Sequence, residues 1–243
     1  MDVFTHSLSS ALLGNVLHLR TIYVNEQFEE RNATFADLLD FVSAAPRLHS
    51  LIIRHAISES RQVIQPANLP TRIKQITIAP SDARTSQLVQ SSLSSSAREI
   101  VDLNTTIWPY QLPIALQRLK LCVDDLARNQ EEMTNAVSSF CRQLIALRKL
   151  HTIEFYSFRP EDITTGTMVT IITIILQLPV CIRVIDLTAI SAKSISAVLM
   201  SMHLKDRIKQ LQQIRISSSP DDCPGSDLYL KGFAEQGIAV ELV

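Results

Sequence analysis

The sequence predicts an α/β fold in which one strand–helix unit is repeated along the chain and the strands run parallel. Two observations carry this prediction. A short apolar pattern typical of a strand recurs, and the segments between its copies have apolar residues at helical spacing. The chain has 243 residues, 46% of them hydrophobic, which is enough to bury a core against such a sheet.

The recurring pattern has three bulky apolar positions in the order L-x-x-L-x-L. Its best copies begin at Leu19, Leu48, Ile73, Leu116, Leu150, Ile182 and Leu211. Poorer copies begin at Arg98 and Gly237. Successive copies start 18 to 34 residues apart, and most of these intervals suit one strand, one helix and two turns. Since one such unit cannot bury its apolar side alone, we expect the copies to stack side by side.

The segments between the copies predict helices. Residues 34–46 place apolar side chains on one helical face, and Thr34 and Asp37 form a capping pair at its start. Further helices are predicted over residues 125–148, 164–178, 194–204 and 226–237. We expect Gly237 to end the last of these in a left-handed conformation. The interval from Arg98 to Leu116 is too short for a helix, so a loop is expected there.

Residues 163–182 contain no charged side chain and are almost long enough to span a bilayer. The same stretch contains Gly166, Gln177 and Pro179, and Arg183 follows it directly. A buried helix followed by a buried strand gives the same hydropathy. We expect that arrangement rather than a membrane span.

Composition argues against several classes of partner and chemistry. Lys and Arg total 23 against 24 for Asp and Glu, so the chain has no excess of positive charge for nucleic acid or an anionic membrane. With only 5 glycines, it cannot build a glycine-rich phosphate loop. His151 and Glu154 have a spacing that places them on opposite faces of a strand. We therefore expect no catalytic residue, no metal site and no cofactor.

The four cysteines are widely spaced and mostly lie in apolar runs: Cys122, Cys141, Cys181 and Cys223. This suits buried, reduced thiols better than disulfides. The first ten residues, MDVFTHSLSS, lack the basic start and compact apolar block of an export signal. We expect a protein of the cytoplasm or the nucleus.

The repeated pattern resembles leucine-rich repeats of the ribonuclease-inhibitor-like kind, and the irregular copies are similar to those of fungal F-box-like proteins. The resemblance covers the chain from about Leu19 to its end. It implies a horseshoe-shaped solenoid with parallel strands on the concave face and helices on the convex face. We expect a single domain over residues 1–243, with about 8 or 9 irregular repeats. The alternative is a doubly wound α/β sheet.

The fifth residue of each copy should point away from the core, onto the open face of the sheet, because strand side chains alternate. These residues are Tyr23, Ile52, Thr77, Asp102, Lys120, Glu154, Asp186, Arg215 and Glu241. Lys120 with Glu154, and Asp186 with Arg215, are placed to pair across neighbouring strands. One interpretation is a self-neutralising row that only solvates the sheet. The other is a protein-binding face, with Tyr23, Ile52 and Tyr156 as apolar anchors.

Trp108 marks a second candidate contact, in the loop that replaces a helix. An aromatic residue there can bind a partner or plug the exposed core. The predicted function is a non-enzymatic scaffold that binds another protein. By resemblance, it would be the substrate-recognition part of a ubiquitin-ligase adaptor. The alternatives are an enzyme, a GTPase-regulating repeat protein, or a structural subunit of a larger assembly.

Overall fold

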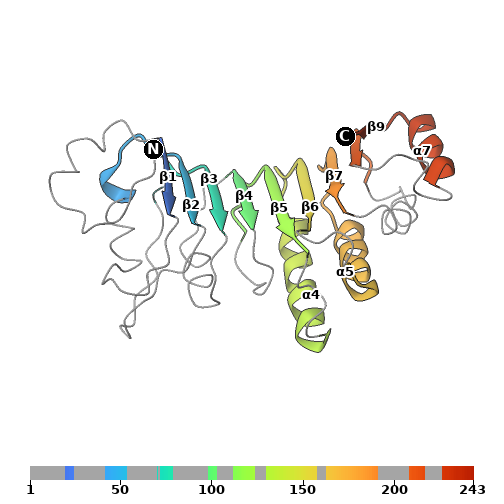
Figure 1. Cartoon of the computed structure of the whole chain (residues 1–243), viewed down its shortest axis with the longest axis horizontal. Coiled ribbons are helices and arrows are strands. Elements are labelled where there is room, and N and C mark those ends of the chain that lie inside the picture. Colours follow the sequence, from blue (N-terminus) through green and yellow to red (C-terminus); the bar gives the residue numbers. More distant parts are fainter. Residues whose placement is uncertain are drawn as a thin grey trace. The chain divides into compact units, whose positions relative to one another are not determined.

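The computed structural model describes residues 20–24, 42–53, 70, 72–78, 98–102, 112–123, 130–157, 163–190, 208–216 and 226–243. The chain divides into two compact units, residues 1–116 and 117–243. The strands and helices of the two units are drawn in Figure 1. The predicted organisation as a single domain of 8 or 9 repeats stays a prediction, as does the horseshoe shape.

The first unit contains four short strands that pair in chain order. They are β1 (Thr21–Val24), β2 (Ser50–Ile53), β3 (Gln75–Ile78) and β4 (Glu99–Asp102). Every neighbouring pair is parallel. Residues 42–44 are helical and fall within the predicted helix 34–46, of which the remainder before residue 42 lies outside the described residues. The prediction of parallel strands is confirmed.

The second unit alternates strands with helices. Its strands are β5 (Arg118–Cys122), β6 (Thr152–Tyr156), β7 (Val184–Ala189), β8 (Gln213–Ile216) and β9 (Ala239–Leu242). Its helices are α4 (Gln130–Ala146), α5 (Thr165–Leu176) and α7 (Ser226–Glu235). The strands pair in chain order and all run parallel. The helix predicted over 194–204 lies outside the described residues.

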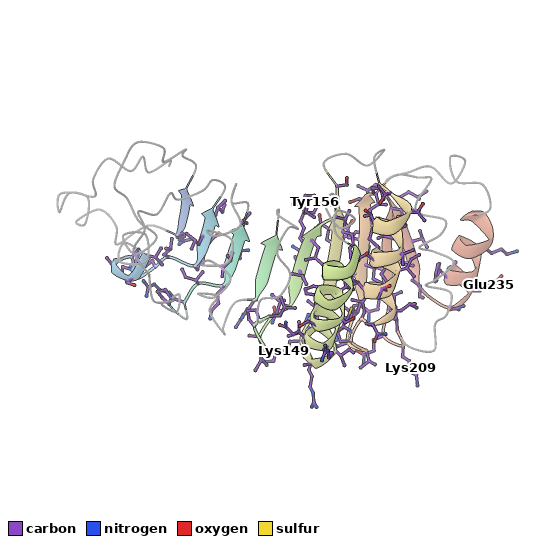
Figure 2. All side chains as sticks on the ribbon, turned by 90° about the horizontal axis from the view of Figure 1, so that it is seen from below. Lys149, Tyr156, Lys209 and Glu235 are labelled. Atoms are coloured by element: carbon purple, nitrogen blue, oxygen red, sulfur yellow. The ribbon has the colours of Figure 1, made fainter. Side chains whose placement is uncertain are left out.

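The core of the second unit is built from the repeated apolar positions. In each of β5 to β8 the fourth and sixth residues of the pattern are fully buried or nearly so. These residues are Leu119, Leu121, Ile153, Phe155, Ile185, Leu187, Ile214 and Ile216. Helix α4 adds its predicted apolar stripe, in which Phe140 and Leu144 are buried. In Figure 2 α4 and α5 lie over the strands of this unit.

The copy that begins at Arg98 was placed one residue out of register by the sequence pattern. In the structure Ile100 pairs with Ile76 and Val101 pairs with Thr77. Asp102 therefore pairs with Ile78, so its assignment to the open-face column is wrong and Val101 takes that position. Ile100 and Val101 are adjacent and both apolar, so the sequence allowed either frame.

A backbone ladder joins successive copies where the strands begin. In the second unit the Gln117 carbonyl accepts from the N–H groups of His151 (2.9 Å) and Thr152 (3.2 Å). The His151 carbonyl accepts in turn from Arg183 (2.8 Å) and Val184 (3.0 Å). Because this ladder joins backbone groups only, it aligns the strands without needing a particular side chain.

Three of the copies are preceded by a turn, which the L-x-x-L-x-L pattern alone did not reveal. The sequence Leu-Pro-x-x followed by the first apolar residue occurs at 69–73, 112–116 and 178–182. In all three the N–H of that apolar residue donates to the proline carbonyl: Ile73 to Pro70 at 3.0 Å, Leu116 to Pro113 at 2.9 Å, and Ile182 to Pro179 at 3.1 Å. Proline suits this position because its fixed φ favours a turn.

The side chain of the residue directly before a copy also donates to carbonyls near the start of the previous copy. The Arg72 guanidinium donates to the carbonyls of Val42, Ser43 (2.9 Å) and Ala45 (2.9 Å). These carbonyls lie at the end of the helical segment 42–44, just before the copy that begins at Leu48. Arg72 thus adds a donor to carbonyl groups at a helix end, where the Val42 carbonyl also accepts from Ala45 N–H (3.3 Å) and the Ala45 carbonyl from Leu48 N–H (3.2 Å).

In the second unit, Cys181 takes the equivalent position directly before a copy. Its thiol lies 3.1 Å from the Leu147 carbonyl and 3.2 Å from the Leu150 carbonyl, and it donates to them. Two unlike side chains, a guanidinium and a thiol, therefore bridge consecutive copies from the same place in the repeat.

The uncharged stretch 163–182 forms the buried helix that was expected. Helix α5 begins after Thr164, whose hydroxyl accepts from the Thr167 N–H at 3.2 Å. Its buried residues include Met168, Ile171 and Ile175. Within the described ranges, no helix combines the length and the apolar character that crossing a bilayer requires.

Gly237 ends helix α7 in the predicted left-handed conformation, with φ at 74°. Its N–H donates to the Ala234 carbonyl at 2.9 Å, and the Ile238 N–H donates to the Phe233 carbonyl at 2.9 Å. These two bonds form a Schellman motif, and the apolar residues at both ends of it, Phe233 and Ile238, are buried. The prediction for Gly237 is confirmed, and the cap delivers the chain into β9.

The cap gives a direct stability test. Gly237→Ala should lower the free energy of unfolding by about 1 kcal/mol, because a Cβ disfavours positive φ even where the surrounding space is open. Gly237→Asn should cost less, since asparagine tolerates this conformation. Urea unfolding followed by circular dichroism measures both. Equal losses from Ala and Asn would contradict a conformational origin.

Candidate partner-binding surface

On the open face of the second unit, the fifth residue of every copy is charged. The in-register pairing of β5 to β9 places the fifth residue of each copy beside that of the next. We call these residues the charged row: Lys120, Glu154, Asp186, Arg215 and Glu241. Neighbouring strands are about 4.8 Å apart, so charges from distant parts of the sequence become direct neighbours.

The charged row is paired internally, as the sequence suggested. The Lys120 ammonium forms an ion pair with the Glu154 carboxylate. Arg215 lies between two carboxylates, with its Nη1 3.7 Å from Asp186 Oδ2 and its Nε 2.8 Å from Glu241 Oε2. The bond to Glu241 was not predicted, because the last copy fits the repeat pattern poorly.

Asp186 is the most enclosed member of the charged row, with 8% of the residue exposed. Its Oδ1 accepts from the Thr188 N–H at 3.1 Å and from the Thr188 hydroxyl at 2.7 Å. Its Oδ2 faces Arg215. Both carboxylate oxygens therefore have partners, which a buried charge requires. No pattern in the sequence pointed to the contribution of Thr188.

The order of signs along the charged row leaves its centre acidic. From β5 to β9 the charges run positive, negative, negative, positive and negative. Glu154 and Asp186 are register partners on adjacent strands, and each has its cation on the side away from the other. Like charges on neighbouring strands repel. The space over these two carboxylates is therefore favourable for a positively charged group.

Tyr156 is buried, with 6% of its surface exposed. The Lys120 Nζ lies 4.8 Å from the centroid of its ring, within the range of a cation–π contact. The ring supports Lys120, and the expectation of an exposed apolar anchor at this position is corrected. Alternation along a strand predicts the face of a side chain but not the neighbour that covers it.

The remaining predicted contact residues belong to the first unit. Ile52 is half-buried in β2, beside Thr77 of β3. Tyr23 is the register partner of Ile52, and its side chain lies outside the described part of the structure, as does Trp108. The roles of Tyr23, Ile52 and Trp108 in binding stay predictions.

The described cysteines are free thiols: Cys122, Cys141 and Cys181. Burial raises the pKa of Cys141 to about 11. Burial also raises the pKa of Cys181, although its backbone hydrogen bonds and Arg183 act in the opposite direction. Both groups are therefore protonated at neutral pH and are weak nucleophiles. Within the described ranges, no group of three or more His, Cys, Asp or Glu residues could hold a metal ion.

The enclosed carboxylate predicts an asymmetry between the two ion pairs of Arg215. In double-mutant cycles with Arg215→Met, Asp186→Asn should show a coupling of about 1 kcal/mol, larger than that of Glu241→Gln. The reason is that Asp186 is better shielded from water, whereas exposed pairs contribute little. Urea unfolding at low and high salt measures both. A larger coupling to Glu241, despite its shorter contact, would contradict this ranking.

Comparisons with known proteins identify a structural likeness and no family. No family model matches the chain, and no curated protein matches it. Among solved structures, the chain is similar to the leucine-rich repeat-containing protein LegL7 from Legionella pneumophila, with 13% sequence identity and a TM-score of 0.44. The likeness covers 75% of this chain and 60% of that protein, so the chain spans less than two thirds of LegL7.

Proposed function

We propose that the chain is a non-enzymatic scaffold that binds another protein through the open face of β5 to β9. The observation that carries this proposal is the charged row, in which five side chains are aligned by backbone register and held by ion pairs. It extends over about 19 Å, four strand spacings, which suits a macromolecule better than a small ligand.

Charge order is the feature through which this surface would select its partner. A basic side chain of the partner fits over Glu154 and Asp186, at the acidic centre of the charged row. Acidic side chains of the partner fit near Lys120 and Arg215. Complementary charges of this kind raise association rates and exclude wrong partners more than they add affinity. Binding should therefore weaken as salt concentration rises.

The proposal is tested by exchanging one pair of charges. In the double variant Lys120→Glu, Glu154→Lys, the ion pair and the net charge are retained but the charge order is reversed. We expect roughly tenfold weaker capture of the native partner, because the swap moves a positive charge into the acidic centre. Affinity capture from the native source, quantified by mass spectrometry, measures this effect.

The control variant is Arg142→Glu, on the exposed surface of α4. It should leave capture unchanged within about twofold. Thermal unfolding of the swapped variant should stay close to that of the wild type, since exposed ion pairs contribute at most about 1 kcal/mol. Full capture by the swapped variant, or equal loss from the Arg142 control, would contradict binding through the open face.

The narrower proposal is that the scaffold forms the substrate-recognition part of a ubiquitin-ligase adaptor. It is supported only by the resemblance of the irregular repeats to those of fungal F-box-like proteins. The same capture experiment tests it, because ligase core subunits should then be recovered with the chain. Their absence, with other partners present, would remove the ligase setting and leave the scaffold proposal in place.

A further inference from the structure

We infer that the edge of the second unit at which strands β5 to β8 begin is a separate contact surface, suited to an acidic segment of the partner protein. We call it the turn edge, defined by residues 117–118, 147–152, 178–184 and 208–213. This inference rests on the proposed function, because it adds a second point of contact for the same class of partner.

Basic side chains gather on the turn edge. Five of them are exposed: Arg118, Arg148, Lys149, Arg183 and Lys209. The four segments contain no Asp or Glu. In Figure 2 the labelled residues Lys149 and Lys209 lie at the end of the strands opposite Tyr156.

The acidic side chains that the structure describes in this unit lie outside the turn edge. Glu154 and Asp186 belong to the open face, and Glu235 precedes β9, beyond the turn edge. The chain as a whole has a formal net charge of −1. Composition alone conceals a basic surface of this kind, because it averages over both ends of the strands.

The backbone holds these basic residues in a fixed row. The turns before β7 and β8 are closed by hydrogen bonds from Ile182 N–H to the Pro179 carbonyl (3.1 Å) and from Leu211 N–H to the Ile208 carbonyl (3.2 Å). Arg183 also takes part in the backbone ladder, where its carbonyl accepts from Gln212 N–H at 2.8 Å. A surface that is ordered before binding loses less entropy when a partner docks.

Helix dipoles explain only part of this arrangement. Basic residues near a helix C-terminus are stabilising, and Arg148 and Lys149 follow the end of α4. The effect falls off within the last turn, and the last turns of α4 and α5 contain no basic residue. Arg183 stands at the start of β7, well beyond the end of α5. Lys149 and Lys209 are exposed, and within the described residues neither forms an ion pair.

The chemistry of the turn edge favours an acidic protein segment over two other polyanions. Single-stranded nucleic acid is normally held by aromatic platforms as well as cations, and the four segments contain no Phe, Tyr or Trp. Proteins bind membrane surfaces through clustered cations together with several apolar or aromatic side chains that insert. Of the large apolar residues in the four segments, Val180 alone is exposed. An acidic protein segment can bind through its carboxylates to the row of basic side chains alone.

Basic residues also lie near the strand starts of the first unit. Arg20, Arg47 and Arg98 are exposed at or just before the starts of its strands. The described segment 45–50 contains no Asp or Glu, and neither does 72–75. Basic residues thus precede strands in the first unit as well, although β4 itself begins with Glu99.

The test uses a fluorescein-labelled decaglutamate peptide and fluorescence anisotropy on the full chain at low salt. Lys149→Gln, Lys209→Gln should weaken binding of this peptide roughly fivefold to tenfold, since two cations are removed from the row. The matched control Arg142→Gln, Lys231→Gln removes the same charge from exposed positions on α4 and α7 and should change binding by less than about twofold. Circular dichroism confirms that both variants are folded.

Two comparison probes decide between ligand classes. Oligothymidine of matched charge and phosphatidylserine vesicles should bind more weakly than decaglutamate. Tighter binding of either probe through Lys149 and Lys209 would overturn the assignment to an acidic protein segment. Equal binding of decaglutamate by the edge variant and its control would overturn the turn edge itself.

The swapped variant Lys120→Glu, Glu154→Lys separates this inference from the proposed function. It should bind decaglutamate like the wild type, because the charged row lies apart from the turn edge. Loss of native capture only in the swapped variant would support the open face and overturn the turn edge as a partner contact. Loss of decaglutamate binding only in the edge variant would support the turn edge, even if native capture does not depend on the charged row.

Discussion

The structure depends on the burial of three apolar side chains in one repeated short strand, as in the copies that begin at Leu116, Leu150, Ile182 and Leu211. A single copy leaves that apolar side exposed, so each copy is stabilised by the next one along the chain. Parallel pairing then follows from the equal direction of the connections, and the backbone ladder that begins at residues such as Gln117 and His151 aligns the strands. Because the strands are aligned, the open-face residues at equivalent positions of successive copies lie side by side in rows, although their identities differ between copies.

These rows make a polar surface from residues that the sequence keeps far apart. Lys120 and Glu154 are separated by a whole strand–helix unit, yet they form an ion pair on the open face. Arg215 joins Asp186 to Glu241 in the same manner. The charge order along such a row can change through single substitutions without disturbing the core, which makes the surface suitable for specific recognition.

Much of the fold was predictable because the apolar pattern that determines it is short and recurs along the chain. The apolar pattern predicted every described strand, helical spacing predicted α4, α5 and α7, and Gly237 was identified as a cap. The prediction was wrong where the local signal was ambiguous, as at Ile100 and Val101, where two adjacent apolar residues allowed two frames. It also missed what only packing decides, including the burial of Tyr156 under Lys120 and the partners of Asp186.

The central claim is that the apolar triplets are parallel neighbours in chain order, because every surface described above follows from that register. Nuclear Overhauser contacts between backbone protons of β6 and β7 test it most directly. Parallel register predicts contacts that join Thr152 to Val184 and Glu154 to Asp186. Contacts from Thr152 to the far end of β7, near Ala189, would indicate antiparallel strands and contradict the account.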